Sequence, residues 1–327
     1  MSKIGLKHLN AGDSFIGFCI IRKKELRHKQ NGQPYLDLEL GDFSGRLKAK
    51  VWDKAKETYV KVHVGQIIKV KGSIQTFLNK NELHIERWRN AREDEYKLEE
   101  LIPSSEKNVT QLKSRLQHHI NSIENIYLNK LITKLFPDET FLDKYLISPS
   151  GKLWHHNYLY GTLEHLVCLL DLADILIIHY PSLNKDLLKC GILLHDVGKQ
   201  IGYNQEGYID FSLKGRLIGH TVLGYQMVQK AIQSIDNFPD DLNIQLSHLI
   251  LSHQGKGEKG SPVVPMTFEA MALNLLDELD GQINAVQRII KYDKMPDSPW
   301  SRFNNLLERF IYIGDKSENQ DTNKQND

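Results

Sequence analysis

The chain has 327 residues, with 42 Lys and Arg against 41 Asp and Glu. This length allows two domains with a sizeable core, the composition is that of a soluble globular protein, and the net charge of +1 alone indicates nothing about nucleic acid. The charge is unevenly divided, because residues 1–92 carry 19 Lys and Arg and 9 Asp and Glu, a net +10, and the remainder carries −9. We therefore expect a basic module followed by an acidic one.

The cysteines and the apolar runs exclude two classes of protein. Cys19, Cys168 and Cys190 are widely spaced in apolar runs, which indicates reduced, buried thiols in a cytoplasmic protein and not a disulfide framework. Residues 1–8 lack the apolar segment of a signal peptide. The most apolar run, 166–178, contains two aspartates and is too short to cross a bilayer, so no membrane association is expected.

The first 92 residues show the alternation and turn signals of short strands. The expected strands cover 15–21, 35–40, 46–52, 66–72 and 82–86, with a short helix at 53–59. Asn31-Gly32 is a strong hairpin signal between the first two strands. Five such strands predict an N-terminal barrel of the oligonucleotide-binding (OB) type, a fold that holds single strands with a basic groove and aromatic stacking.

Basic and aromatic side chains of this barrel are candidate nucleic-acid contacts, and the stretch from Tyr35 to Trp52 resembles the strand-turn-strand of nucleic-acid-binding OB domains. Arg46, Lys48 and Lys50 share one strand face at a period of two, and we expect them to contact phosphates, against the alternative of a solvated edge. The candidate stacking residues, each of which could instead belong to the barrel core, are Tyr35, Phe43, Trp52, Phe77 and Trp88.

The rest of the chain predicts an all-helical architecture. Residues 93–150 are expected to form a helical connector, with a charged helix at 93–101 and helical periodicity over 109–136. Residues 151–313 are expected to form a second, all-helical domain, and the polar stretch 314–327 is expected to be disordered.

The second domain contains the pair His195-Asp196 at the end of an apolar helical run, 187–194. Imidazole and carboxylate both bind divalent cations, and mixed nitrogen and oxygen ligands suit Mn, Fe, Co or Zn. Candidate partners lie on four other predicted helices, and helical bundles assemble metal sites from side chains on facing helices. These partners are His165, His220, His253 and Asp277.

The helix that carries Asp277 is expected to begin near Thr267. An apolar stripe follows it at a period near 3.6, as in an amphipathic helix. The stripe consists of Phe268, Met271, Leu275, Leu279, Ile283, Val286 and Ile290.

The order His, His-Asp, His, His, Asp resembles that of the HD-domain metal-dependent phosphohydrolases. Two stretches, 154–165 and 268–280, further resemble the YhaM-type 3′-5′ exoribonucleases, and the order of an OB barrel and then an HD domain agrees with that family. The resemblance implies an enzyme that releases nucleoside monophosphates from the 3′ end of single-stranded RNA. It implies six metal ligands, which are His165, His195, Asp196, His220, His253 and Asp277.

Six ligands are too many for one tetrahedral ion and suit two divalent ions, with Mn favoured and Co, Fe or Zn as alternatives. We expect His165, His195, Asp196 and Asp277 to hold the first ion, and His220 with His253 to hold the second, with Asp196 bridging. Lys199, and less strongly Arg216, are expected to neutralise developing charge. The candidate catalytic residues are therefore His195, Asp196, Lys199 and Arg216.

Several assignments stay open. His155, His156, His179 and His248 are ambiguous, and His248 does not share a helix face with His253. Asp280, three residues after Asp277, could replace it or assist it. Single-stranded DNA is an alternative partner to RNA, and a homo-oligomer is compatible with the sequence.

Two other functions also stay open. One is an HD phosphohydrolase of free or cyclic nucleotides, because Gly207-Tyr208-Ile209 is faintly similar to the Gly-Tyr-Pro signature of cyclic-dinucleotide phosphodiesterases; it lacks the proline, however, and precedes His220. The other is a non-catalytic single-stranded DNA-binding factor with a structural HD site. The basic OB-like module argues against the first, and the complete ligand set with Lys199 argues against the second.

Overall fold

The computed structural model describes residues 5–78, 80–137, 139–151, 155–204, 210–292, 295 and 298–314. The chain divides into two compact units: Met1–Asn108 with Tyr158–Tyr160 and Gln200–Leu217, and Val109–Asn157 with Gly161–Lys199 and Ile218–Asp327. Trp154, the tripeptide 207–209 and the predicted disordered tail from 315 onward lie outside the described residues. The predicted fold class, an OB barrel followed by helices, is confirmed.

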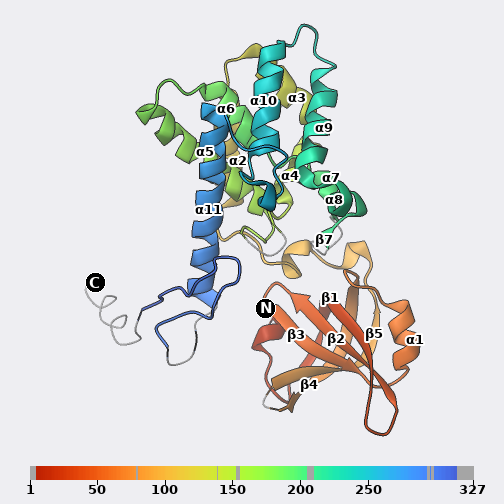
Figure 1. Ribbon diagram of the computed structural model, residues 1–327. Helices are drawn as coiled ribbons and strands as arrows, with labels where there is room; N and C mark the ends of the chain where they lie inside the picture. Colours follow the sequence, from red (N-terminus) through yellow and green to blue (C-terminus); the bar gives the residue numbers. More distant parts are fainter. Residues whose placement is uncertain are drawn as a thin grey trace. The chain divides into compact units, whose positions relative to one another are not determined.

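The barrel has the predicted five strands and the predicted helix after the third (Figure 1). Its elements are β1 (Ser14–His28), β2 (Pro34–Asp42), β3 (Gly45–Val51), α1 (Ala55–Lys61), β4 (Ile67–Phe77) and β5 (Lys80–Asn90). The strands close in the order β1-β2-β3-β5-β4, with β3 and β5 parallel. A register shift between Ile21 and Lys23 bends β1, so that its first half pairs with β4 and its second half with β2.

Alternation along the strands separates the barrel core from its outer surface. The Asn31-Gly32 turn joins β1 to β2, and Gly32 takes the left-handed φ of 79° that this turn needs. Buried residues at every second position form the core; among them are Leu36, Leu38, Leu40, Ala49, Val51, Val70, Ile74 and Leu83. The residues between them on β2 and β3 therefore face outward.

The second unit is a bundle of helices around α6 (Lys185–Leu194), which packs against α3, α5, α10 and α11. Residues 187–194 of α6 are all buried. The other long helices of the bundle are α2 (Val109–Asn121), α3 (Ile126–Leu135), α4 (Glu139–Ile147), α5 (Gly161–His179), α9 (His220–Ile232), α10 (Asp240–Ser252) and α11 (Phe268–Tyr292). Because α6 ends at Leu194, the His195-Asp196 pair emerges in the middle of the bundle.

Shorter elements connect these parts. They are η1 (Leu6–His8), η2 (Glu93–Glu95), η3 (Leu98–Glu100), α7 (Lys199–Gly202), β6 (Tyr203–Asn204), β7 (Asp210–Phe211), α8 (Leu213–Ile218) and η4 (Gly257–Lys259). No helix among the described residues combines the length and apolar character needed to cross a membrane.

Residues 93–150, predicted as a helical connector, form shorter helical segments than their periodicity suggested. The single helix expected at 93–101 is replaced by the short 3₁₀ turns η2 and η3. The periodic stretch 109–136 divides into α2 and α3, because the Asn125 side chain accepts hydrogen bonds from the amides of Tyr127 and Leu128 and so starts a new helix. The domain limits at 92, 150 and 313 stay predictions.

Candidate metal centre and nucleic-acid surface

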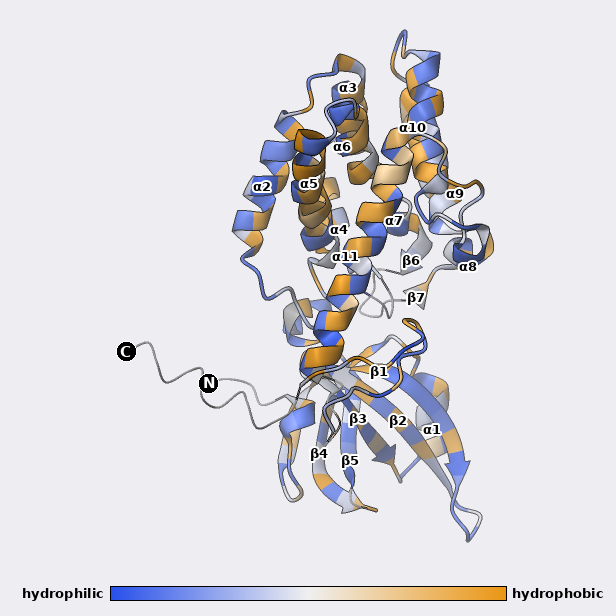
Figure 2. Cartoon of the chain, turned by 60° about the vertical axis from the view of Figure 1, so that its left-hand side comes forward, coloured by the Kyte–Doolittle hydropathy of each residue, from blue (hydrophilic) through white to orange (hydrophobic). Residues whose placement is uncertain are grey.

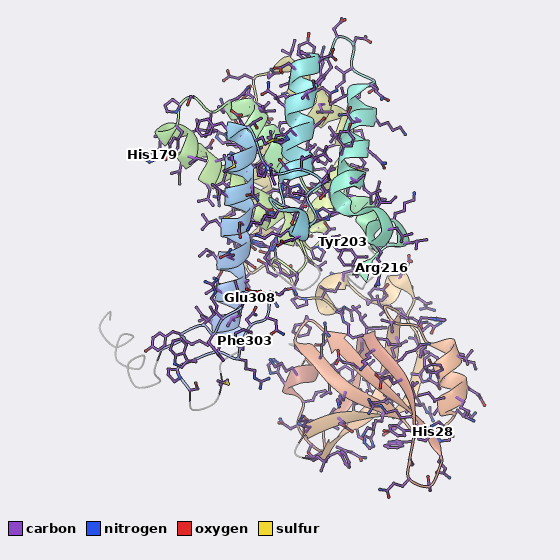
Figure 3. All side chains as sticks on the ribbon, viewed as in Figure 1. His28, His179, Tyr203, Arg216, Phe303 and Glu308 are labelled. Atoms are coloured by element: carbon purple, nitrogen blue, oxygen red, sulfur yellow. The ribbon has the colours of Figure 1, made fainter. Side chains whose placement is uncertain are left out.

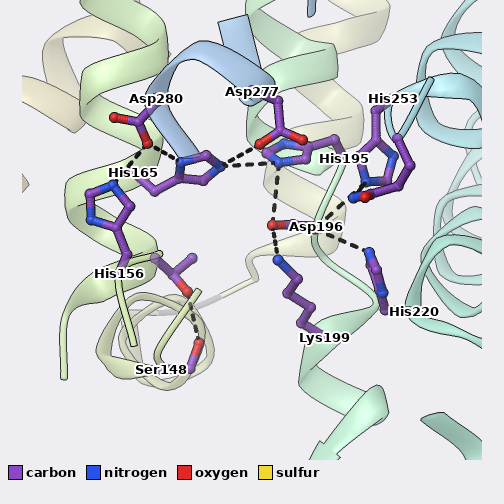
Figure 4. Close-up of polar contacts among 12 residues, drawn as sticks. Ser148, His156, His165, His195, Asp196, Lys199, His220, His253, Asp277 and Asp280 are labelled. Atoms are coloured by element: carbon purple, nitrogen blue, oxygen red, sulfur yellow. Dashed lines mark hydrogen bonds and ion pairs between the residues drawn. The ribbon is translucent and has the colours of Figure 1, made fainter. Parts of the chain in front are cut away.

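The six predicted ligands lie on or directly after five helices, and their side chains gather in one cluster, as expected (Figure 4). His195 and Asp196 follow α6, and His253 follows α10. His220 is the first residue of α9. His165 lies near the start of α5 and Asp277 in the middle of α11.

Glycines set the approach of α9 to the His195-Asp196 turn. A Cβ on Gly198 would lie 2.0 Å from the His220 carbonyl oxygen and 2.4 Å from the Gly224 nitrogen. Gly219 has a left-handed φ of 83°, which lets the chain turn directly into α9. These two glycines therefore allow His220 to lie beside Asp196.

Asp196 is the centre of the cluster. Its Oδ2 lies 3.3 Å from His195 Nε2, and its Oδ1 lies 3.5 Å from His220 Nε2 and 3.8 Å from His253 Nε2. Two neighbouring distances complete the arrangement: His165 Nε2 is 3.4 Å from His195 Nε2 and 3.3 Å from Asp277 Oδ1. The six predicted ligands are thus brought together, with Asp196 between two groups of histidines.

The ring orientations leave Nε2 of three histidines directed into the cluster. His195 Nδ1 donates to the Ile192 carbonyl at 2.7 Å, and His253 Nδ1 donates to the Ile250 carbonyl at 2.7 Å. His165 Nδ1 is held by Asp280 Oδ2 at 2.6 Å. Such outer hydrogen bonds fix the tautomer that offers the Nε2 lone pair to a cation.

Asp280 contacts His165 directly, which favours the assignment of Asp280 as an assisting residue. Its Oδ2 also accepts from His156 Nε2 at 2.8 Å, and the Asn284 side chain accepts from the His156 amide at 2.9 Å. The role of Asn284 was missed by sequence reasoning. A signal existed, because positions 277, 280 and 284 recur at helical spacing on one face of α11.

Burial and charge set the protonation of the cluster. Burial lowers the pKa of His165, but its hydrogen bonds to Asp277 and Asp280 outweigh this and raise the pKa to about 10. Burial lowers the pKa of His220 to about 3 and that of His253 to about 4. Burial alone would raise the pKa of Asp196, but the charges of Lys199 and His195 hold it well below its usual range. The neutral imidazoles of His220 and His253 and the ionised carboxylate of Asp196 are the forms that bind divalent cations, whereas His165 would have to release a proton when a cation binds.

The cluster fits bound cations, because two of its buried polar atoms make no hydrogen bond among the described residues. Asp196 Oδ1 and His220 Nε2 are buried and make no hydrogen bond among the described residues. Leaving such atoms unpaired is costly, and a cation between them would satisfy both. Four triads of described residues have ligand atoms close enough to share an ion. Two contain Asp196: His165, His195 and Asp196, and Asp196, His220 and His253. The other two are His155, His165 and Asp277, and His156, His165 and Asp280.

Lys199 and Arg216 are placed differently. Lys199 is buried and its Nζ forms an ion pair with Asp196 Oδ2. Arg216 lies on α8, which belongs to the other compact unit, so its predicted role stays a prediction (Figure 3). His248 Nε2 accepts a hydrogen bond from the Met266 amide and is absent from the metal-binding groups of the described residues.

On the barrel, three of the candidate stacking residues gather around Lys50. The rings of Tyr35 and Trp52 lie 4.9 Å apart, and Lys50 Nζ lies 4.7 Å from the Phe77 ring centre and 5.6 Å from that of Trp52. Trp52 is 36% exposed and Phe77 56% exposed. We call these four residues the aromatic face; it offers flat apolar surfaces beside a positive charge.

The basic candidates and the two remaining aromatic candidates differ in their contacts. Arg46 pairs with Glu39 at 2.9 Å and Lys50 with Glu82 at 2.6 Å, whereas Lys48 is exposed. Trp88 packs against the barrel core and donates to Thr58 Oγ1 at 3.3 Å, as its alternative assignment allowed. Phe43 is 39% exposed.

Comparison with known proteins agrees with both units. Residues 162–282 match the HD domain and residues 20–91 match the OB-fold nucleic acid binding domain. A 3′-5′ exoribonuclease YhaM of Listeria welshimeri serovar 6b is 31% identical over 290 residues, which cover 88% of this chain and 92% of the relative. Another, of a Geobacillus species, is 30% identical over 309 residues, 94% of each chain.

A solved structure of an isolated OB-fold domain resembles part of this chain. The second OB-fold domain of replication protein A from Methanococcus maripaludis is 16% identical, with a TM-score of 0.23, and covers 28% of this chain and 95% of that chain.

Proposed function

The chain belongs to the YhaM family of 3′-5′ exoribonucleases, and we propose that it hydrolyses single-stranded RNA from the 3′ end to nucleoside monophosphates. The observation that carries the proposal is the buried cluster in which Asp196 lies between two groups of histidines on a chain that also has an OB barrel. The cluster supports phosphodiester hydrolysis, and the barrel supports a single-stranded polymer as substrate.

The cluster would hold two divalent ions. We assign His165, His195, Asp196 and Asp277 to the first ion and His220 with His253 to the second, with Asp196 shared. Two such ions, when bound, activate water and stabilise negative charge on the attacked phosphate. Lys199 would add a positive charge beside that phosphate. Mn is the favoured metal, with Co, Fe or Zn as alternatives, because mixed histidine and carboxylate ligands suit all four.

End-labelled RNA tests the function. Metal-loaded protein should release labelled mononucleotide at once from a 3′-labelled strand, and should shorten a 5′-labelled strand step by step. Single-stranded DNA and a cyclic dinucleotide, offered under the same conditions, should be cleaved more slowly. Rapid cleavage of the cyclic dinucleotide with no attack on RNA would overturn the assignment in favour of a nucleotide hydrolase.

We propose that the aromatic face binds the single-stranded RNA, and Trp52→Ala should lower the affinity for RNA. Stacking on one aromatic side chain stabilises binding by about 1–3 kcal/mol per base, so KM for a long single strand should rise roughly tenfold or more. Turnover of a small activated phosphodiester should not change. Trp300→Ala, which removes an exposed tryptophan outside the barrel, is the matched control. An unchanged KM for Trp52→Ala would remove the aromatic face from the interface.

The cellular setting is inferred from the thiols. Cys19 and Cys190 are buried and free, which supports action in a reducing cytoplasm.

We also propose that the chain self-associates through α11. Its predicted apolar stripe faces outward in the structure, where Figure 2 shows hydrophobic bands along the helix. Exposure is 46% at Met271, 58% at Leu275, 48% at Leu279, 61% at Ile283 and 45% at Ile290. The stripe therefore offers on the order of 500 Å² of apolar surface, approaching the about 800 Å² per partner of a standard interface.

A second copy fits this stripe in the antiparallel direction. Reversing the helix about residue 281 places Leu279 opposite Ile283, and Met271 beside Ile290, one residue from exact alignment, so that apolar side chains lie near apolar side chains at both places. The sequence after Gly314 is polar and has no apolar side chain to cover the stripe.

Leu279→Glu with Ile283→Glu should therefore convert an oligomer to a monomer in analytical ultracentrifugation at micromolar protein. Gln117→Glu, the same change of charge at an exposed position on α2, is the control and should leave the mass unchanged. A monomeric wild type would contradict self-association and would leave another partner, or the first unit of the same chain, to cover α11.

A further inference from the structure

His155 lies in an irregular segment that is fixed to the bundle. The neighbouring His156 has a left-handed φ of 43°, a conformation that persists only where the surroundings determine it. The Ser150 amide donates to the His156 carbonyl at 3.0 Å, and the His156 amide donates to Asn284 Oδ1 at 2.9 Å. The position of His155 is thus set by contacts with α11 and with the end of the preceding segment.

The His155 ring lies against the cluster without a hydrogen bond. Its centre is 5.2 Å from that of His165. Both ring nitrogens are buried, and neither has a hydrogen-bond partner among the described residues. A buried imidazole with two unsatisfied nitrogens is costly, so something that the described residues do not provide should contact it.

The neighbours of His155 indicate what that contact is. One of its ring nitrogens, a nitrogen of His165 and a carboxylate oxygen of Asp277 all lie within 4.8 Å of one another. The latter two residues are assigned to the first ion. A buried imidazole with a ring nitrogen this close to two ligands of one ion can supply a third ligand.

We propose that His155 is a further ligand of the first metal ion, an inference that rests on the proposed two-ion centre. The two ions would then be unlike. The first would have five protein ligands, which are His155, His165, His195, Asp196 and Asp277, and the second three, which are Asp196, His220 and His253. An octahedral ion takes six ligands, so the first would be nearly filled and the second would keep open positions for a phosphate.

Binding of Mn²⁺ and Co²⁺ to the full-length chain tests this assignment without reference to RNA. The protein would be stripped with a chelator and titrated by calorimetry with Mn²⁺, and the visible absorption of the Co²⁺ form would be recorded. In His155→Ala the affinity of one of the two ions should fall by at least about 100-fold, since even loss of an outer hydrogen-bond partner of a ligand costs 10–100-fold. The Co²⁺ spectrum of that ion should change, and the other ion should bind as before.

Two further variants keep the test decisive. His155→Gln retains most of the side-chain volume and should show the same loss, which separates a ligand from a packing residue. His179→Ala, at the exposed end of α5, should leave both ions and the spectrum unchanged (Figure 3). If His155→Ala and His155→Gln bind both ions with wild-type affinity and spectrum, His155 is not a ligand, and contact with the substrate replaces this proposal.

The outcome is independent of the RNA assay. A wild type that binds two ions in a His155-dependent way and leaves RNA intact would overturn the exonuclease function but keep the ligand. A wild type that degrades RNA while the His155 variants keep both ions would keep the exonuclease function but overturn the assignment of His155 as a ligand.

Discussion

The Asp196→Asn variant should lose at least about 10³-fold in kcat on single-stranded RNA, together with bound metal. Asn keeps the volume of the side chain but not the charge that lies between both groups of histidines. The residue is 1% exposed, so water cannot replace the carboxylate. Turnover would be measured on 3′-labelled RNA, and metal content by elemental analysis of the dialysed protein. A variant that retains two ions and wild-type turnover would contradict the site assignment.

The same change should destabilise the metal-free protein, because it breaks the buried ion pair between Asp196 and Lys199. Breaking a buried ion pair by removing one side costs about 3–5 kcal/mol. The double variant Asp196→Asn with Lys199→Met should recover part of this free energy of unfolding but none of the activity. Asp143→Asn removes an exposed carboxylate that pairs with Lys113, and should change neither property.

The Lys199→Met variant should lower kcat by about 10²-fold, on the order of the loss of one donor to a developing negative charge. Met keeps the length of the side chain and removes its positive charge. Metal affinity should not fall, because Asp196 keeps its negative charge and Lys199 no longer neutralises it. Single-turnover kinetics and a Mn²⁺ titration would measure the two effects.

Lys189→Met is the matched control for Lys199. Lys189 is also buried and paired, with its Nζ 2.6 Å from Asp174 Oδ1 and 2.9 Å from Ser122 Oγ, but it lies outside the cluster. This control should lower stability without lowering kcat. Loss of metal in Lys199→Met would instead give Lys199 a structural role.

The main features of the site could be predicted because regular helices carry them. The apolar period indicates which residues α6 buries, and the ends of α6 and α10 fix where His195 and His253 emerge. The outer residues could not be predicted in the same way. His155 and His156 lie in an irregular segment, where no period indicates which way a side chain points.

The barrel shows a second limit of prediction from sequence. Alternation correctly placed Arg46, Lys48 and Lys50 on the outer side of β3. It could not indicate that Glu39 and Glu82 pair with two of them, because those partners come from β2 and β5 and depend on the register between strands. For the same reason, the meeting of Tyr35, Trp52 and Phe77 around Lys50 is a property of the closed barrel.

The apolar stripe of α11 illustrates a third limit. A period near 3.6 indicates that one face of a helix is covered, but not by what. Much of the α11 stripe faces outward, while a different face of the helix, with Leu273 and Asp280, is buried in the bundle.

The dependence of RNA hydrolysis on the number of bound ions tests the two-ion centre most directly. Metal-free protein would be titrated with Mn²⁺ while the ions bound per chain and the release of 3′-terminal mononucleotide are measured on the same samples. We expect hydrolysis to rise only as the second ion binds and to saturate at two ions per chain. Full activity with one ion per chain, or with none, would contradict the assignment of Asp196 as a ligand shared by two ions.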